Sequence, residues 1–319
     1  MYLRRKVDEW LIDWKKRKDK FPALIVGIRQ CGKTKSIENF AINNYKNMVK
    51  LNFWDNPEYC LDFDGSLDVD TIISHISLRF PDKKIYPHDT LIFFDEIQEC
   101  PRARLALKNI ALDGRFDVVC SGSYLGINGY IIGDTTPAPT GYDEVFEMHT
   151  MDFEDFLWAN NYTDEQIDEL EYLFVNRKPI PDAMHSVFKE IFLKYACIGG
   201  FPRAVQEYIY THNIMDAVRI VKNTIFDMRT DFGRRKDKEG HPLFKASEVA
   251  RIQEVFDLIP TFLSKENKRF IVSKISTGSQ RDKGTAIEYL KQAHIVYKVH
   301  NLENPSLPLI VNRIQTQYK

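Results

Sequence analysis

Eight residues near the N-terminus have the types and spacing that bind a phosphate chain. Residues 27–34 read Gly-Ile-Arg-Gln-Cys-Gly-Lys-Thr, a full match to GxxxxGK[ST] between an apolar run and a helical pattern. The glycines let backbone N–H groups turn toward phosphate oxygens at the positive end of a helix. Lys33 would neutralise the β- and γ-phosphates, and the Thr34 hydroxyl would bind Mg²⁺. A chance glycine-rich turn is the weaker alternative. The nucleotide-binding residues that we expect are Gly27, Ile28, Arg29, Gln30, Cys31, Gly32, Lys33, Thr34 and Lys35.

A pair of carboxylates follows about 60 residues later, at the end of a second apolar run. Asp95, at the carboxyl end of a strand, could hold the Mg²⁺ water shell beside Thr34. Glu96 is placed to polarise an attacking water as a general base. Alone this signal is weak, because many apolar runs end in Asp-Glu and a solvated strand end is the alternative. The phosphate-binding pattern upstream makes it the expected second half of the site.

Two serines close a third apolar run, where the chain reads Cys120-Ser-Gly-Ser123. A hydroxyl here could contact the γ-phosphate or the attacking water, and we expect Ser123 rather than Ser121 in that role. An ordinary turn serine is the alternative. Together with Lys33 and Glu96, Ser123 completes the predicted catalytic set. A guanine-reading Asn-Lys-x-Asp signature is missing, since residues 267–270 read Asn-Lys-Arg-Phe, so ATP is favoured over GTP.

Short apolar runs separated by helical patterns must position these residues. This alternation predicts an α/β fold, a P-loop NTPase type of parallel sheet with flanking helices. The 126–141 segment, rich in Gly, Pro and Thr, is expected to be a mobile loop. Asp152 is a plausible N-cap for the helix that follows it. The expected elements are helices over 3–18 and 33–46, strands over 23–26, 48–53, 90–94 and 116–120, and a strand running into a helix over 144–161.

The second half of the chain is predicted to be mostly helical. Residues 162–232 have a helical pattern with one sharp interruption, at Gly199-Gly-Phe-Pro202, and a polar linker follows over 233–242. Three short helical patterns and a strand then appear in the order of a winged helix. These cover 247–263, 268–275, 280–293 and 294–301. The expected domains are therefore a P-loop domain over 1–161, a helical region over 162–242 and a winged-helix domain over 243–319.

Charge is distributed unevenly although the chain carries a net charge of only -1. Residues 1–20 hold eight Lys/Arg against four acids, and residues 265–319 hold ten against four. The basic C-terminal part fits attraction to DNA phosphates. A recognition helix over 280–293 would present Ser279, Gln280, Arg281 and Lys283 to double-stranded DNA. The alternative is a module that docks a protein partner, since Asp282 and Glu288 dilute the charge of the helix.

Composition excludes several classes of protein. With 44% hydrophobic and 28% charged residues, the chain is not disordered as a whole. Its five scattered cysteines lack metal-ligand or disulfide spacing, which favours a reducing cytoplasm. The basic N-terminus is followed by no apolar region of a signal peptide, and no apolar run is long enough to span a membrane. We therefore expect a cytoplasmic protein with no membrane partner.

Four motifs in order carry a family resemblance: residues 27–34, Asp95-Glu-Ile-Gln98, Ser121-Gly-Ser123 and Gly199-Gly-Phe-Pro202. With them the chain resembles the prokaryotic AAA-type (AAA+ superfamily) P-loop ATPases that carry a C-terminal domain of unknown function. The resemblance covers nearly the whole chain. It implies a P-loop domain, a helical part, a winged helix and a restriction-nuclease-like domain. It also implies ATP at 27–34, Mg²⁺ at Thr34 and Asp95, and hydrolysis through Glu96.

Two departures from the family pattern affect the prediction. Gly141-Tyr142 stands where the family usually has Gly-Arg, and if that arginine is a finger or sensor in relatives, its loss predicts slow hydrolysis. The candidate substitutes, which the sequence does not rank, are Arg102, Arg104, Arg115 and Arg203. The chain also stops at Lys319, where relatives continue into the nuclease-like domain. We expect either a natural short form or a truncated chain.

Two functions remain open at this point. The first is a Mg²⁺-dependent ATPase that hydrolyses the β–γ bond and couples this to DNA or partner binding. The second is an ATP-gated switch or docking module with little or no hydrolysis. Asp95 and Glu96 together favour the first, whereas Tyr142 favours the second. A nucleotide kinase is disfavoured because no arginine-rich lid is visible. We expect an ATPase with slow turnover.

Overall fold

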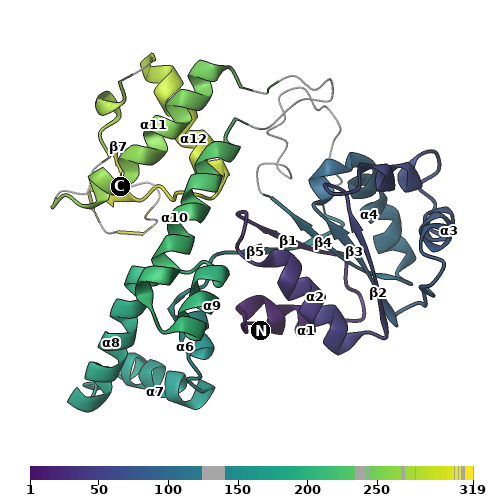
Figure 1. Cartoon of the computed structure of the whole chain (residues 1–319), viewed down its shortest axis with the longest axis horizontal. Coiled ribbons are helices and arrows are strands. Elements are labelled where there is room, and N and C mark those ends of the chain that lie inside the picture. Colours follow the sequence, from purple (N-terminus) through teal and green to yellow (C-terminus); the bar gives the residue numbers. More distant parts are fainter. Residues whose placement is uncertain are drawn as a thin grey trace. The chain divides into compact units, whose positions relative to one another are not determined.

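The computed structural model describes residues 1–123, 141–233, 242, 244–266, 270–276, 278–304, 306, 307, 309 and 313–318 (Figure 1). It divides into two compact units, with the boundary between Thr224 and Ile225. The two units are described separately. The expected loop over 126–141, apart from Gly141, and the linker over 233–242, apart from its two end residues, lie outside the described residues.

A parallel sheet forms the centre of the first unit. Its described strands are in the order β2-β3-β4-β1-β5, so β1 lies between β4 and β5. All strand pairs are parallel, and Ile25 of β1 faces Ser121 of β4 and Phe146 of β5. The expected parallel α/β sheet is confirmed. The bounds are β1 Ala23–Gly27, β2 Asn47–Asn52, β3 Thr90–Asp95, β4 Asp117–Gly122 and β5 Glu144–Met148.

Helices cover both faces of this sheet, as Figure 1 shows. Leu24 and Val26 of β1 point to one face, where they join a core with α3 and α4. Ala23 and Ile25 point to the other face, where they pack with α1 and α2. Alternate side chains of a strand point to opposite faces, so a strand buried on both sides must be apolar throughout, as β1 is. The bounds are α1 Lys6–Lys16, α2 Lys33–Asn44, α3 Val69–Arg79 and α4 Pro101–Asp113.

The helical remainder of the first unit has more breaks than the sequence predicts. Asp152 caps α6 as expected, because its Oδ1 accepts a hydrogen bond of 2.9 Å from the N–H of Asp155. The break at residues 199–201 is present. A second lies between α7 and α8, where Pro179 and Pro181 disfavour helix. A third follows α9, where His212 has a φ of 51°. The bounds are α6 Phe153–Ala159, α7 Asp164–Val175, α8 Asp182–Ile198, α9 Pro202–Thr211 and α10 Ile214–Asp231.

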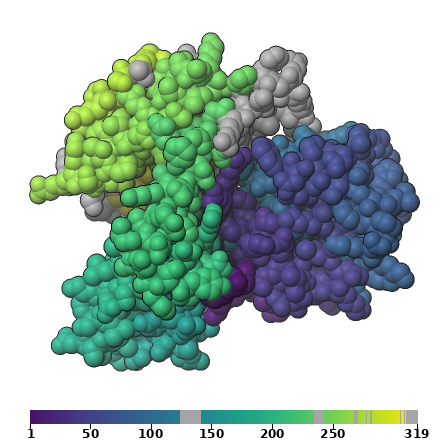
Figure 2. Space-filling model, viewed as in Figure 1, coloured from purple at the N-terminus to yellow at the C-terminus, as the bar shows by residue number. Residues whose placement is uncertain are grey.

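A third core holds this helical part together. Phe156 of α6, Ile198 of α8 and Val205 of α9 are buried in it, together with Leu3 from the N-terminal segment and Met151. None of the side chains of α7 is buried. The space-filling view shows α7 and α8 as the teal surface at one end of the first unit (Figure 2). Apolar side chains exposed on these two helices are Tyr172, Phe174, Val175, Val187, Phe192 and Leu193.

The second unit contains α11 (Ala246–Leu263), α12 (Gln280–Gln292), β6 (His300–Leu302) and β7 (Arg313–Tyr318), and β6 pairs with β7 in antiparallel fashion. Ile287, Leu290 and Ala286 of α12 are buried.

Two predicted elements of this unit are wrong. The expected helix over 268–275 is, in its described part, only a 3-10 turn over Val272–Lys274. The neighbouring β-branched residues Ile271, Val272 and Ile275 disfavour a helix. The expected strand over 294–301 exists only at its end, in β6. The N–H groups of Ile295 and Val296 instead bond the carbonyl of Leu290, so the chain folds back on α12.

Candidate nucleotide-binding site

The loop between β1 and α2 has the backbone shape of an anion site. Gly27 ends β1 so close to β5 that a Cβ on it would lie 2.2 Å from the carbonyl oxygen of Met148. Gln30 and Gly32 have φ values of 64° and 103°, in the left-handed region. Successive N–H groups in such a loop form a concavity that attracts anions, and α2 adds the positive end of its dipole. Gly32 is the N-cap of α2 and has no side chain to cap the helix itself.

Lys33 is held within this loop. The residue is 5% exposed, and its Nζ donates hydrogen bonds to the carbonyl oxygens of Gly27 (3.0 Å) and Ile28 (2.9 Å). These bonds fix the ammonium on the inner side of the turn. A buried positive charge held there can neutralise an anion that enters the concavity.

Asp95 connects the P-loop to the neighbouring strands. It lies at the end of β3 and is 2% exposed. The carboxyl ends of parallel strands lie at the same edge of the sheet, which places Asp95 near the P-loop that follows β1. The Thr34 hydroxyl donates to its Oδ1 over 3.0 Å, and the Ser121 hydroxyl donates to the same atom over 2.5 Å. The Lys50 ammonium lies 3.0 Å from Oδ2. The predicted pair of Thr34 and Asp95 is thus in direct contact.

The donor set around Asp95 suits Mg²⁺ held jointly with a nucleotide. Thr34 and Asp95 supply a hydroxyl and a carboxylate oxygen, the hard ligands that Mg²⁺ prefers. Among the described residues, no group of three or more His, Cys, Asp or Glu could hold a metal by themselves. Mg²⁺ commonly keeps waters and binds one or two protein groups together with substrate phosphates, so two protein ligands are sufficient here.

Glu96 follows in a constrained backbone conformation. Its φ of 55° is left-handed, which is uncommon for a residue with a side chain and costs energy. Its N–H donates to the Ser121 hydroxyl over 3.1 Å, and its carboxylate accepts from the Gln98 amide over 2.6 Å. The side-chain oxygen of Gln98, Oε1, accepts a hydrogen bond from the backbone N–H of Ser123 over 3.3 Å. A chain of hydrogen bonds therefore runs from Thr34 to Ser123.

Three residues of this arrangement were not among those predicted for the site. Gln98 holds the carboxylate of Glu96, and Ser121, ranked below Ser123, holds Asp95. Lys50 of β2 bonds both Asp95 and Glu38, and although burial opposes it, these bonds raise the pKa of Lys50 overall. Gln98 ends the motif Asp95-Glu-Ile-Gln98 that carries part of the family resemblance, and this was the signal for its role. Lys50 belongs to no recognisable motif. The pairing of β2 with β3 brings it to Asp95.

A family model described as an AAA domain matches residues 19–157, which contain every site residue named above. Over these residues the chain is similar to the AAA domain family. A second model, described as Domain of unknown function (DUF8612), matches residues 189–318. No curated protein matches the chain.

Solved structures with a similar fold include a Walker-type ATPase. The Walker-type ATPase PABY2304 of Pyrococcus abyssi is 12% identical, with a TM-score of 0.55, over 100% of this chain and 93% of that chain. ORC2 of Aeropyrum pernix is 10% identical (TM-score 0.42, 93% and 88% covered). DnaA of Aquifex aeolicus is 11% identical (TM-score 0.38, 92% and 91% covered). The first similarity shows a shared fold, and the other two TM-scores are too low to support a conclusion.

The four candidate substitutes for an arginine at Tyr142 have different surroundings in the structure. Arg115 precedes β4 and bonds Asp113 and Asp70, at the edge of the sheet opposite the P-loop. Arg102 bonds the carbonyls of Phe63 and Gly65.

Arg104 and Arg203 are the other two. Arg104 lies 3.9 Å from Asp143, and burial lowers its pKa. Arg203 is exposed in the first turn of α9. Its neighbour Pro202 packs on the P-loop, 3.4 Å from where a Cβ on Gly32 would lie. Arg203 therefore follows directly on a residue that contacts the P-loop.

The residues predicted to contact DNA lie in the second unit. Ser279 is the N-cap of α12, and its hydroxyl bonds the Asp282 carboxylate over 2.9 Å. Lys283 donates from its Nζ to the carbonyl of Ile275 over 2.6 Å. The side chains of Gln280 and Arg281 lie outside the described part of the chain. The two described side chains thus support the local fold, and their contact with DNA stays a prediction.

Proposed function

We propose that this chain is a Mg²⁺-dependent ATPase that hydrolyses the β–γ bond of ATP. The observation that carries the proposal is the chain of contacts from the P-loop to Glu96, through Thr34, Asp95 and Ser121. It joins a phosphate-binding loop, a metal-binding pair and a carboxylate base at one edge of the sheet. An AAA domain with these parts fits ATP binding, and Glu96 adds the group that hydrolysis needs.

Each group has a defined task in this reaction. The loop N–H groups and Lys33 hold the β- and γ-phosphates. Thr34 and Asp95 would hold Mg²⁺, which would neutralise charge on the phosphate oxygens. Glu96 orients a water for attack on the γ-phosphorus and accepts its proton. The products are ADP and phosphate. Gln98 keeps the Glu96 carboxylate aimed in one direction.

We assign the transition-state charge partner to Arg203. Tyr142 cannot supply a positive charge, and its ring instead packs against Phe21, with centroids 6.2 Å apart. Arg203 is exposed and follows Pro202, which contacts the P-loop, and this position supports the assignment. An arginine in that place stabilises charge that develops on the transferring phosphoryl group.

An ATP-gated switch with little hydrolysis is the second candidate. Tyr142 in place of arginine favours it. In either case we propose that the basic second unit couples the nucleotide to duplex DNA or a protein partner, since its excess of Lys and Arg suits phosphates. The chain's free cysteines fit a cytoplasmic location. Within the described residues, no helix is both long and apolar enough to cross a membrane.

Binding is tested with Lys33→Ala. We expect this variant to lose the rise in melting temperature that Mg-ATP gives the wild type, because it removes the buried ammonium of the P-loop. Lys46→Ala is the control, since its side chain is 74% exposed and pairs with Asp89, away from the residues expected to bind the nucleotide. An undiminished ATP-dependent shift in Lys33→Ala would refute the assignment.

A further inference from the structure

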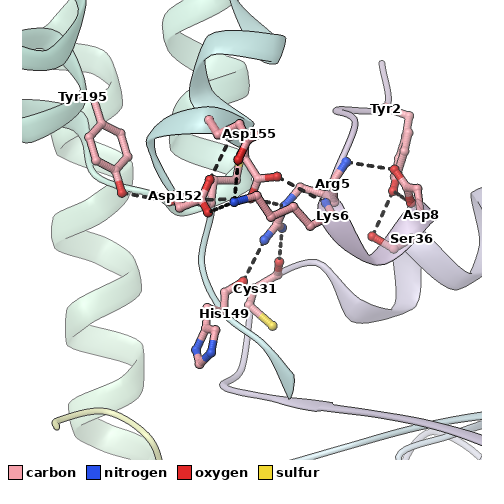
Figure 3. A network of polar contacts seen from close by, with 12 residues as sticks. Tyr2, Arg5, Lys6, Asp8, Cys31, Ser36, His149, Asp152, Asp155 and Tyr195 are labelled. Carbon is pink, nitrogen blue, oxygen red and sulfur yellow. Dashed lines mark hydrogen bonds and ion pairs between the residues drawn. The ribbon is translucent and has the colours of Figure 1, made fainter. Parts of the chain in front are cut away.

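A buried arginine precedes the first helix and reaches the P-loop from outside the matched AAA domain. Arg5 is 5% exposed. Its Nη1 donates to the carbonyl of Cys31 (2.8 Å), its Nη2 to the carbonyl of His149 (2.7 Å), and its Nε to the Asp155 carboxylate (3.1 Å), as Figure 3 shows. One guanidinium thus joins the P-loop, the segment after β5 and helix α6. The AAA match begins at residue 19, so it does not include this group.

The segment that carries Arg5 is itself anchored. The backbone N–H of Arg5 donates to Asp8 Oδ2 over 2.8 Å. The Tyr2 hydroxyl bonds Asp8 Oδ1 (2.5 Å) and Ser36 Oγ of α2 (3.0 Å), and Leu3 is buried in the core of the helical part. The hydrogen bonds of Tyr2 and Asp8 are also visible in Figure 3. Together these contacts hold the guanidinium in place without a bound ligand. A group held in this way loses little freedom when it orients a neighbour.

The bond to Cys31 determines the direction of a peptide in the P-loop. A trans peptide is planar, so its carbonyl and the following N–H point in opposite directions. Arg5 draws the Cys31 carbonyl toward α6, and the N–H of Gly32 must then point away from it, toward the concave side of the loop. The φ of 103° at Gly32 continues that turn into α2. Without Arg5 this peptide could rotate and withdraw a donor from the anion site.

We propose that Arg5 is a positioning residue that holds the Cys31–Gly32 peptide ready for the β-phosphate of a nucleotide. The inference rests on the proposed ATP binding and adds the N-terminal segment to that site. Asp155 completes the arrangement, since it is 3% exposed and fixes the Nε side of the guanidinium. Through Asp155 of α6, the helical part therefore also holds the guanidinium that orients the P-loop peptide.

The test is an equilibrium titration with the fluorescent nucleotide MANT-ATP in the presence of Mg²⁺. We expect Arg5→Gln to weaken binding by about tenfold or more, as loss of a charge-assisted hydrogen bond would. Arg4→Gln is the matched control, because the neighbouring Arg4 bonds Asp164 and Glu9 on the surface and its side chain is 43% exposed. We expect its affinity to equal that of the wild type. Arg5→Lys should recover only part, since lysine keeps the charge but not the fork of donors.

A purely structural role is tested with Ile76→Ala, which lowers stability from a core position of α3, in a hydrophobic cluster that contains no residue of the P-loop. If Arg5→Gln binds MANT-ATP as tightly as an Ile76→Ala variant of similar melting temperature, the positioning role is wrong. If Arg5→Gln does not fold, Arg5→Lys takes its place in that comparison. Failure of the wild type itself to bind MANT-ATP would refute the proposed function, and with it this inference.

Discussion

Asp95 is the residue on which the candidate site depends. The sequence motif predicts its contact with Thr34, because a P-loop and a strand ending in Asp-Glu recur together. It does not predict which serine meets it. Ser121 lies in β4 and Ser123 directly after it, and only the pairing register, with Phe94 opposite Cys120, places Ser121 level with Asp95. Contacts set by register cannot be obtained from residue types alone.

Gln98 offers a prediction at the same scale. Gln98→Ala removes the amide that holds the Glu96 carboxylate at 2.6 Å, and we expect the rate of phosphate release to fall roughly tenfold while ATP affinity is retained. Single-turnover kinetics with Mg-ATP would measure it. Asn43→Ala is the control, because Asn43 is an exposed amide on α2 that bonds Asn39 in its own helix. Unchanged or faster release by Gln98→Ala would exclude this positioning role.

At the scale of elements, the apolar runs locate the strands of the first unit to within one or two residues. Strands buried on both faces must be continuously apolar, so this signal is strong. The weaker predictions fail where local preference is overridden. The breaks around Pro179 and His212 fall within an otherwise helical pattern, and residues 295–299 look like a strand but fold back on α12. No sequence pattern indicates that the segments of β6 and β7 pair with each other.

The junction of α4 and β4 gives a prediction about pH. Hydrogen bonds from Arg115 hold the pKa of Asp113 below its ordinary value, so its charge stabilises the fold above about pH 4 and this stabilisation is lost as pH falls through the lowered pKa. Asp113→Asn should therefore lower the free energy of unfolding at pH 7 by less than about 1 kcal/mol, and the melting temperature should fall with it. Near pH 3 we expect a smaller decrease or none. Thermal unfolding across pH 3–7 would show this.

The control for this prediction is Asp13→Asn, since Asp13 is an exposed carboxylate on α1 that pairs only with Lys16 among the described residues. We expect little change in its melting temperature across the range. A difference between wild type and Asp113→Asn that grows as the pH falls would contradict the argument.

At the scale of the whole molecule, the division at Thr224–Ile225 falls within α10. The first unit has the proposed ATP site, and the second has most of the basic C-terminal charge. Sequence predicts the first function more firmly, because phosphate binding needs one particular loop. It predicts the second less well, because a DNA-contacting face and a solvated face have the same composition. Lys283, bonded to Ile275, illustrates how a basic residue can serve the fold instead.

The most direct test of the account is steady-state phosphate release from ATP by the full chain with Mg²⁺, with Glu96→Gln as the blank and duplex DNA added in a parallel series. We predict slow release by the wild type above that blank, abolished by chelation of Mg²⁺ and stimulated by DNA at low salt. No stimulation would remove DNA from the proposal and leave a protein partner. Release no greater than that of Glu96→Gln, under conditions where ATP binds, would contradict the central claim of hydrolysis and leave the ATP-gated switch.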